Sequence, residues 1–343
     1  MKTAVVVCPG RGVYNQGELG YLARRHADKA ALFASFESER RRLGQATLAA
    51  LDGAEAYSAA VHTRGDSASA LIYAASLADF LSIDRGRIDI VAVTGNSMGW
   101  YTALACAGAL TPEAGFEVAN TMGALMQESL IGGQIVYPFV DDDWAPNPGR
   151  KAELLALVEE IGRRDAYALA LSIDFGGMLV VAGNEAGLAA FEAAVPPRRG
   201  RFPLRLANHA AFHTPLQAPV AEKGRARLSA GRFASPRLPL IDGRGAIAWP
   251  HATDPKALWD YTFGRQVTAP YDFTRAIHVA AREFAPDLFV VLGPGTTLGG
   301  AVAQALILAD WRGMASKADF QARQESAPLL VAMGLDEQRP LAA

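Results

Sequence analysis

A strand, a tight turn and a helix are predicted in one uninterrupted stretch. The strand is the apolar run at residues 88–94, IDIVAVT, the turn is GNSMG at 95–99, and an Ala- and Leu-rich helix follows to residue 110. A G-x-S-x-G turn between a strand and a helix exposes its central serine at the tip. The flanking glycines let neighbouring backbone pass without a Cβ clash. The stretch predicts an α/β fold with Ser97 as a candidate nucleophile; the alternative is an ordinary strand-to-helix turn.

The composition excludes several classes of protein. Of the 343 residues, 50% are hydrophobic and 20% charged, with a net charge of -2, which suits a soluble globular protein. The chain has no long run of like charges that would indicate nucleic-acid binding. No apolar run is long enough to span a membrane. Two cysteines, Cys8 and Cys106, make no disulfide framework and are expected as small buried residues. Because the chain enters a strand almost at once, we expect a cytoplasmic protein without a secretory signal.

Strands and helices alternate along most of the chain, which predicts a largely parallel sheet. A first strand at residues 4–7 ends in the glycine-rich loop at 9–12, and a late strand is expected at 288–292. We assign residues 1–132 and 208–324 to one discontinuous domain with an α/β-hydrolase-like core. Residues 325–343 are expected to form a peripheral tail.

Residues 133–207 are predicted to form an inserted subdomain. Two helices, at 150–162 and 185–195, are expected among four strands, at 135–140, 167–175, 178–182 and 203–207. The order βαββαβ is that of a ferredoxin-like unit. Such an insertion creates a cleft beside the main domain, and clefts between domains are frequent ligand sites.

A nucleophilic serine needs a base, and six histidines are available. His209 and His213 lie where the insertion rejoins the main domain, so one of them is expected beside Ser97. Their spacing also suits two metal ligands on one helical face, but no Cys, Asp or Glu follows nearby to complete a site, and no metal is expected. The other four histidines are expected at the surface (His26, His278) or in polar loops (His62, His251).

The order of acid and histidine in an α/β-hydrolase offers a second interpretation. There an acid and then a late histidine follow the nucleophile, which would be His278 with Asp254 or Asp260. His278, however, lies inside a predicted helix, and this interpretation leaves the insertion unexplained. It is the weaker of the two.

Ordered motifs from residue 1 to about 315 carry a resemblance to a known family. They are PGRG at 9–12, GNSMGWY at 95–101, AGAL at 107–110, VVAG at 180–183, AFHTPL at 211–216, RQV at 265–267 and GPG at 293–295. In this order they resemble the malonyl-CoA:acyl carrier protein transacylases, a family that includes the acyltransferase domains of fatty-acid and polyketide synthases.

The resemblance implies a mechanism and a set of site residues. Ser97 would take an acyl group from a thioester, with His213 as general base and then general acid. The backbone carbonyl of Gln266 would orient His213, and the N–H groups of Met98 and Arg11 would hold the oxyanion. The substrate would be an acyl-CoA, the partner an acyl carrier protein, and no cofactor is implied.

The chain departs from the family at the acyl pocket. The arginine that pairs with the malonyl carboxylate corresponds to Met122, and the elbow histidine and glutamate correspond to Asn96 and Trp100. A buried carboxylate without a cationic partner is costly, so we expect a neutral acyl group, acetyl or longer. The expected acyl pocket comprises Asn96, Trp100, Met122, His209 and Phe212.

Three alternatives remain open. The first is an acyl-thioester hydrolase on the same scaffold. The second is a malonyl transferase in which Arg11, which replaces a family glutamine, supplies the lost charge. The third is a degenerate, non-catalytic subunit that docks carrier proteins. Acyl-chain length and oligomeric state do not follow from the sequence.

Overall fold

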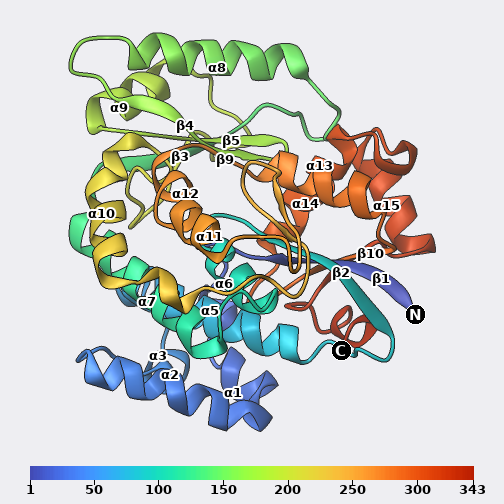
Figure 1. Cartoon of the computed structure of the whole chain (residues 1–343). Helices are drawn as coiled ribbons and strands as arrows, with labels where there is room; N and C mark the ends of the chain where they lie inside the picture. Colours follow the sequence, from blue (N-terminus) through green and yellow to red (C-terminus); the bar gives the residue numbers. More distant parts are fainter.

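A computed structural model describes residues 1–343, and its larger part is built on a six-stranded sheet (Figure 1). The strand order is β11-β10-β1-β2-β7-β8, and all neighbours are parallel except the β7–β8 pair at one edge. Apolar runs buried on both faces, such as Val5 to Val7, are typical of such sheets. The strands are β1 (Lys2–Cys8), β2 (Ile88–Gly95), β7 (Leu240–Ile241), β8 (Ile247–Ala248), β10 (Leu288–Val291) and β11 (Leu330–Ala332).

Helices cover both faces of this sheet (Figure 1). Three separate helices lie between residues 21 and 52, and the helix after the serine turn begins at Gly99. The α-helices are α1 (Tyr21–Arg25), α2 (Ala30–Arg42), α3 (Leu48–Asp52), α4 (Ala59–His62), α5 (Gly65–Leu81), α6 (Gly99–Cys106), α7 (Pro112–Ser129), α10 (Ala218–Arg227), α11 (Pro255–Thr262), α12 (Arg265–Thr268), α13 (Phe273–Phe284), α14 (Thr297–Leu308) and α15 (Lys317–Ser326).

The inserted unit has the predicted ferredoxin-like order. Its elements are β3 (Gly133–Pro138), α8 (Pro148–Gly162), β4 (Leu169–Phe175), β5 (Met178–Gly183), α9 (Glu185–Ala194) and β6 (Leu204–Arg205). The strands pair antiparallel in the order β6-β3-β5-β4. A fifth strand, β9 (Tyr271–Asp272), comes from the main domain and pairs with β4. The predicted fold class is therefore confirmed, with one strand crossing the expected boundary.

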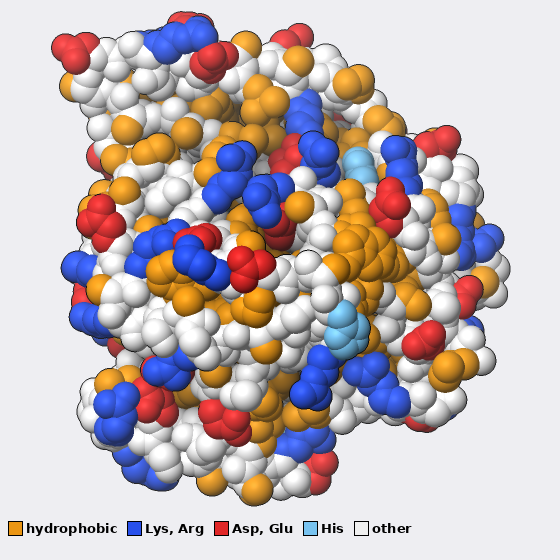
Figure 2. Space-filling model, in the orientation of Figure 1, with side chains coloured by type: hydrophobic (Ala, Val, Ile, Leu, Met, Phe, Trp, Pro, Cys, Tyr) orange, Lys and Arg blue, Asp and Glu red, His pale blue; other side chains and the backbone are white.

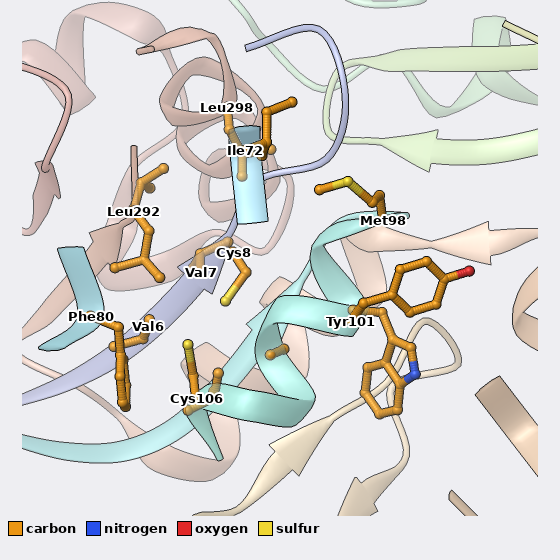
Figure 3. Packing of buried hydrophobic residues seen from close by; sticks show 14 of the residues in the cluster. Val6, Val7, Cys8, Ile72, Phe80, Met98, Tyr101, Cys106, Leu292 and Leu298 are labelled. Carbon is orange, nitrogen blue, oxygen red and sulfur yellow. The ribbon is translucent and has the colours of Figure 1, made fainter. Parts of the chain in front are cut away.

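Two hydrophobic cores keep the units distinct. One cluster of 75 buried residues fills the main domain and takes in Ile173 and Val180 from the insertion's sheet. A separate cluster of 14 lies between the insertion's helices and its sheet. Cys8 and Cys106 are buried free thiols, as predicted, and Figure 3 shows them among apolar side chains of the main core. At the surface, charged side chains of both signs alternate with apolar ones (Figure 2). None of the helices combines the length and the apolar character needed to cross a bilayer.

The C-terminal segment differs from the prediction. It was expected to be peripheral, but β11 is an edge strand of the main sheet, paired in parallel with β10. Met333 and Ala342, which follow it, have no solvent exposure. The apolar run at residues 329–333 is too short to identify a strand by itself. Its role comes from β10, a partner about forty residues earlier in the chain.

The prediction that His26 lies at the surface is also wrong. Its side chain is completely buried, and Nε2 lies 2.8 Å from Oδ1 of Asp79 on α5. Asp79 also accepts hydrogen bonds from Tyr21 Oη at 2.8 Å, from the Gly293 N–H at 2.7 Å and from Arg339 Nη1 at 2.6 Å. These four partners come from three segments that are far apart in sequence, at residues 21–26, 293 and 339. The carboxylate thus ties the tail, the first helix and the loop after β10 together.

Candidate functional site

Ser97 occupies the sharp turn between β2 and α6. Its φ of 53° lies in the left-handed region, which is strained for a residue with a side chain. The turn closes only because its flanking residues lack a Cβ. A Cβ on Gly95 would lie 2.3 Å from the Gly99 carbonyl oxygen, and one on Gly99 would lie 2.2 Å from the Cys8 carbonyl oxygen. The side chain of Ser97 is therefore held at the tip, where the sequence placed it.

His213 lies directly against the serine. Its Nε2 is 2.8 Å from Ser97 Oγ, and its Nδ1 is 2.6 Å from the carbonyl oxygen of Gln266. Because a carbonyl only accepts, Nδ1 carries the proton and Nε2 presents a lone pair to the hydroxyl. Burial lowers the pKa of His213 to about 4, although the hydrogen bond to Gln266 acts in the opposite direction. His213 is therefore neutral at pH 7 and can accept a proton from Ser97.

Gln266 has a second role that the sequence did not indicate. Its side-chain Nε2 donates to the Ser97 carbonyl oxygen at 3.0 Å, and Tyr101 Oη donates to its Oε1 at 3.3 Å. On the other side of the turn, Tyr271 Oη donates to the Gly95 carbonyl oxygen at 2.5 Å. One residue thus braces both the serine turn and the histidine. No spacing in the sequence signals these contacts, because α12 meets the turn only in the folded chain.

Two backbone N–H groups at the serine have no partner in the protein. They belong to Met98 and Arg11, the pair predicted to hold an oxyanion. Met98 immediately precedes α6, and Arg11 lies in the loop after β1. That loop packs tightly on the serine turn, since a Cβ on Gly10 would lie 2.7 Å from the Asn96 carbonyl oxygen. Free N–H groups at a nucleophile can stabilise negative charge on a carbonyl oxygen.

The Arg11 side chain is held by backbone oxygens and not by a carboxylate. One Nη2 donates to the carbonyl oxygens of Thr63 at 2.9 Å and Asn208 at 2.6 Å. The guanidinium lies 5.4 Å from the centre of the Phe212 ring, within range of a cation–π contact. Its Nε is buried without a partner. Burial lowers the pKa of Arg11 to about 10, so the side chain remains a cation at neutral pH.

Two cavities meet at Ser97. The larger, about 590 Å³, lies between the main domain and the insertion. Half of its lining residues are hydrophobic, such as Phe175 and Phe202, and Arg199 and Arg201 line it as well. The smaller, about 20 Å³, lies on the other side of Ser97 among α5, α6, α7 and α12. Figure 3 shows Met98 and Tyr101, which line it, projecting from the start of α6. Ser97, Arg11 and Phe212 line both cavities.

The predicted acyl-pocket residues separate into two groups. Asn96, His209 and Phe212 line the larger cavity, where the His209 and Phe212 rings are 5.8 Å apart. Trp100 and Met122 line neither cavity. Trp100 is fully buried and donates from Nε1 to Thr262 Oγ1 at 2.9 Å.

Met122 lies at the expected position on α7, but its side chain points away from Ser97. It has no solvent exposure, and a Cβ on Gly224 of α10 would lie 2.7 Å from its sulfur. The methionine one turn later, Met126, lines the small cavity in its place. Residues four apart share a helix face, so the α7 side chain that reaches the space beside Ser97 is one turn beyond the predicted position.

The remaining candidates lie elsewhere. His278 Nε2 is 2.8 Å from the carbonyl oxygen of Ala305 on α14, and the histidine beside Ser97 is His213, which removes the α/β-hydrolase arrangement. Asp260 forms ion pairs with Arg225 and Lys256. The structure contains no group of three or more His, Cys, Asp or Glu side chains that could hold a metal ion.

Comparison with known proteins points to one family. No protein-family model matches the chain. Malonyl CoA-acyl carrier protein transacylase of Salmonella typhimurium is 26% identical over 215 residues, which are 61% of this chain and 63% of that protein. The match therefore spans less than two thirds of that relative's length.

Solved structures share the fold over a greater length. Malonyl-CoA:acyl carrier protein transacylase of Xanthomonas oryzae has a TM-score of 0.76 at 19% identity, covering 99% of this chain and 97% of its own. A malonyl-transacylase in complex with a type II polyketide synthase acyl-carrier protein has a TM-score of 0.72 at 22% identity, covering 89% of this chain and 93% of its own. In sequence over much of its length, and in fold over nearly all of it, this chain resembles the malonyl-CoA:acyl carrier protein transacylases.

Proposed function

We propose that this protein transfers an acyl group from one thioester to another through an ester on Ser97. The observation that carries the proposal is the chain of two hydrogen bonds from Ser97 Oγ through His213 to the Gln266 carbonyl oxygen, at 2.8 and 2.6 Å. It lies at the junction of two cavities. Such a pair activates a hydroxyl without any metal or cofactor. The names of the similar proteins support thioesters of coenzyme A and of a carrier protein as substrates.

In the first half-reaction Ser97 is acylated. Its Oγ attacks the thioester carbonyl carbon while the hydroxyl proton moves to His213 Nε2. The carbonyl π electrons move to the oxygen, which becomes an oxyanion near the Met98 and Arg11 N–H groups. When the oxyanion reforms the carbonyl, the C–S bond breaks and the sulfur takes the proton from His213. The products are a free thiol and the Ser97 ester.

The second half-reaction reverses these roles. A thiol on the accepting carrier gives its proton to His213, and its sulfur attacks the ester carbonyl. The C–Oγ bond then breaks, Oγ recovers the proton, and the acyl group leaves as a new thioester. A pantetheine arm that fills the large cavity would keep water from the ester, which favours transfer over hydrolysis. The Gln266 carbonyl keeps the proton of His213 on Nδ1 in both halves.

We further propose that the acyl group is neutral. Arg11 is the only charged residue that lines the small cavity beside Ser97, since His213 is neutral at pH 7. The Arg11 guanidinium already has two carbonyl partners, Thr63 and Asn208, and stacks near Phe212. At the position of the family's carboxylate-binding arginine stands Met122, which faces α10. A malonyl carboxylate would lack an arginine partner at position 122. The one cation beside it would be Arg11, which the Thr63 and Asn208 carbonyl oxygens hold in place.

Intact-mass spectrometry tests the reaction. Wild-type protein mixed with acetyl-CoA should gain one acyl mass on Ser97 and lose it when a carrier bearing a free phosphopantetheine thiol is added. Ser97→Ala should gain none. Continuous release of free CoA without an acceptor would instead establish a thioester hydrolase. Failure of the wild type to acquire any acyl group from a panel of acyl-CoAs would refute catalysis and leave a carrier-binding role.

A further inference from the structure

The two cavities divide a thioester substrate between them. The large one, about 590 Å³, extends away from Ser97 along the insertion's sheet and is the only one of the two with room for a pantetheine arm. The small one begins at Ser97 and His213 and is enclosed by α5, α6, α7 and α12. When the pantetheine arm occupies the large cavity, the substituent on the carbonyl carbon faces the small one.

The small cavity has almost no depth. Its volume is about 20 Å³, and a cavity of about 10–15 Å³ already holds one water molecule. The methyl group of an acetyl ester fits this space. A malonyl group, which carries a methylene and a carboxylate beyond its thioester carbonyl, has four heavy atoms to place and does not fit.

The floor of the cavity cannot recede, because α5 and α7 touch there backbone to backbone. A Cβ on Gly123 would lie 2.4 Å from the Gly65 carbonyl oxygen and 2.7 Å from Ser69 Oγ, and a Cβ on Gly65 would lie 2.5 Å from the Gly123 carbonyl oxygen. Helices packed at such a distance leave no space behind them. The lining side chain whose shortening would enlarge the cavity is that of Met126, which is partly exposed and unbranched.

We infer that this site selects a two-carbon acyl group, acetyl, and that Met126 sets the limit on chain length. The inference rests on the proposed acyl transfer through Ser97 and specifies which acyl group is transferred. Met126 acts by filling the space into which a third and fourth acyl carbon would extend. Arg11 closes the side of the cavity between Ser97 and Phe212, and it is held there by two backbone oxygens.

Rates of Ser97 acylation with a series of acyl-CoAs test the limit. Wild-type protein is mixed separately with acetyl-, propionyl-, butyryl- and malonyl-CoA at one subsaturating concentration, and the acyl-enzyme is followed by intact mass. Acetyl loading should exceed butyryl and malonyl loading by roughly a hundredfold, because each misfitted methylene changes a rate by about tenfold or more. Butyryl or malonyl loading as fast as acetyl loading would overturn the inference.

The variants Met126→Val and Met122→Val form a matched pair on one helix. Both shorten a methionine of α7, but only Met126 lines the cavity. Met126→Val should raise butyryl relative to acetyl loading by about tenfold, while Met122→Val should leave this ratio at the wild-type value. The ratio is measured on folded, acetyl-competent protein, so loss of stability does not affect it. An unchanged ratio in Met126→Val, or an equal change in both variants, would contradict the inference. If wild-type protein forms no acyl-enzyme with any of the four, the proposed function fails and the inference with it.

Discussion

Two buried histidines in this molecule have different surroundings. His213 contacts a hydroxyl and a backbone carbonyl, both neutral, at the edge of two cavities. His26 lies against the Asp79 carboxylate, which also receives Arg339, and no cavity of the site reaches it. Both imidazoles are almost fully shielded from solvent.

The difference shows what allows a buried histidine to act as a base. At His213 no nearby carboxylate stabilises the imidazolium, so the ring stays neutral and available until a reaction supplies negative charge beside it. At His26 the Asp79 carboxylate has four hydrogen-bond partners, and the imidazole ring is one member of this buried network. We therefore expect chemistry from the first centre and stability from the second, and each prediction below tests that division.

The largest expected effect is on catalysis. His213→Ala removes the proton acceptor of Ser97 and should slow acylation from acetyl-CoA by about a thousandfold or more. His26→Gln should leave the rate per folded molecule at the wild-type value. Quenched-flow intact mass measures both rates. A comparable loss in the two variants would show that the two centres do not differ in the way proposed.

The next effect is on stability. Asp79→Ala leaves His26 and Arg339 without their shared carboxylate, and breaking a buried pair in this way costs roughly 3–5 kcal/mol of unfolding free energy. Urea denaturation followed by fluorescence measures the cost. Asp336→Ala is the control, because Asp336 is 85% exposed in its ion pair with Arg25 and should cost at most about 1 kcal/mol. Equal costs would mean that the buried network contributes no more than a surface pair.

The third effect is on pH dependence. Because the pKa of His213 is lowered from 6.5 to about 4, the base is neutral throughout pH 6–8 and acylation should be level there. Below the folded pKa the rate should fall about tenfold per pH unit, as the imidazole becomes protonated. Acylation rates of the wild type in a series of buffers measure the profile. A midpoint near 6.5 would show that burial does not shift this group.

The same shift has a consequence for stability. Between about pH 4 and 6.5 the unfolded chain binds a proton at His213 that the folded chain does not, so this residue favours unfolding increasingly as the pH falls. His213→Gln should therefore lose less stability than the wild type between pH 7 and 5. Parallel losses in wild type and variant would contradict the assignment.

The smallest expected effect is within the Asp79 network. Tyr21→Phe removes one donor, the hydroxyl 2.8 Å from Asp79, while the ring and the other three donors remain. We expect a loss of about 1–2 kcal/mol, the usual range for a hydrogen bond to a charged group. Urea denaturation of this variant and of Asp79→Ala compares the stability lost with one hydrogen bond to the stability lost with the whole network. A loss as large as that of Asp79→Ala would mean that the network collapses when any one donor is removed.

Local patterns identified one half of the candidate site, and long-range contacts supplied the other. Ser97 is recognisable because strand, turn and helix are consecutive, so every residue that shapes its backbone is within reach of the motif. His213 lies 116 residues further on and was singled out from His209 only by the family resemblance. The side-chain amide of Gln266 gave no signal, because its role depends on α12 packing against the serine turn.

The errors have the same physical origin. His26 has charged neighbours in sequence, yet its partner Asp79 is 53 residues away, and residues 329–333 become a strand only beside β10. Met122 occupies the expected position on α7, but the direction of its side chain depends on α10. In each case the contact that determines the structure joins residues far apart in the sequence, whereas sequence patterns reflect only neighbouring residues.

The sequence by itself determined the alternation of strands and helices, the inserted ferredoxin-like unit and the exposed serine, because periodicity and glycine positions act over a few neighbouring residues. Only the tertiary structure decided how the Gln266 side chain supports the serine turn and how much space remains beside Ser97. That space depends on α5 and α7 meeting at Gly65 and Gly123, a close approach of two backbones. A volume of about 20 Å³ is what several separate segments leave unfilled between them.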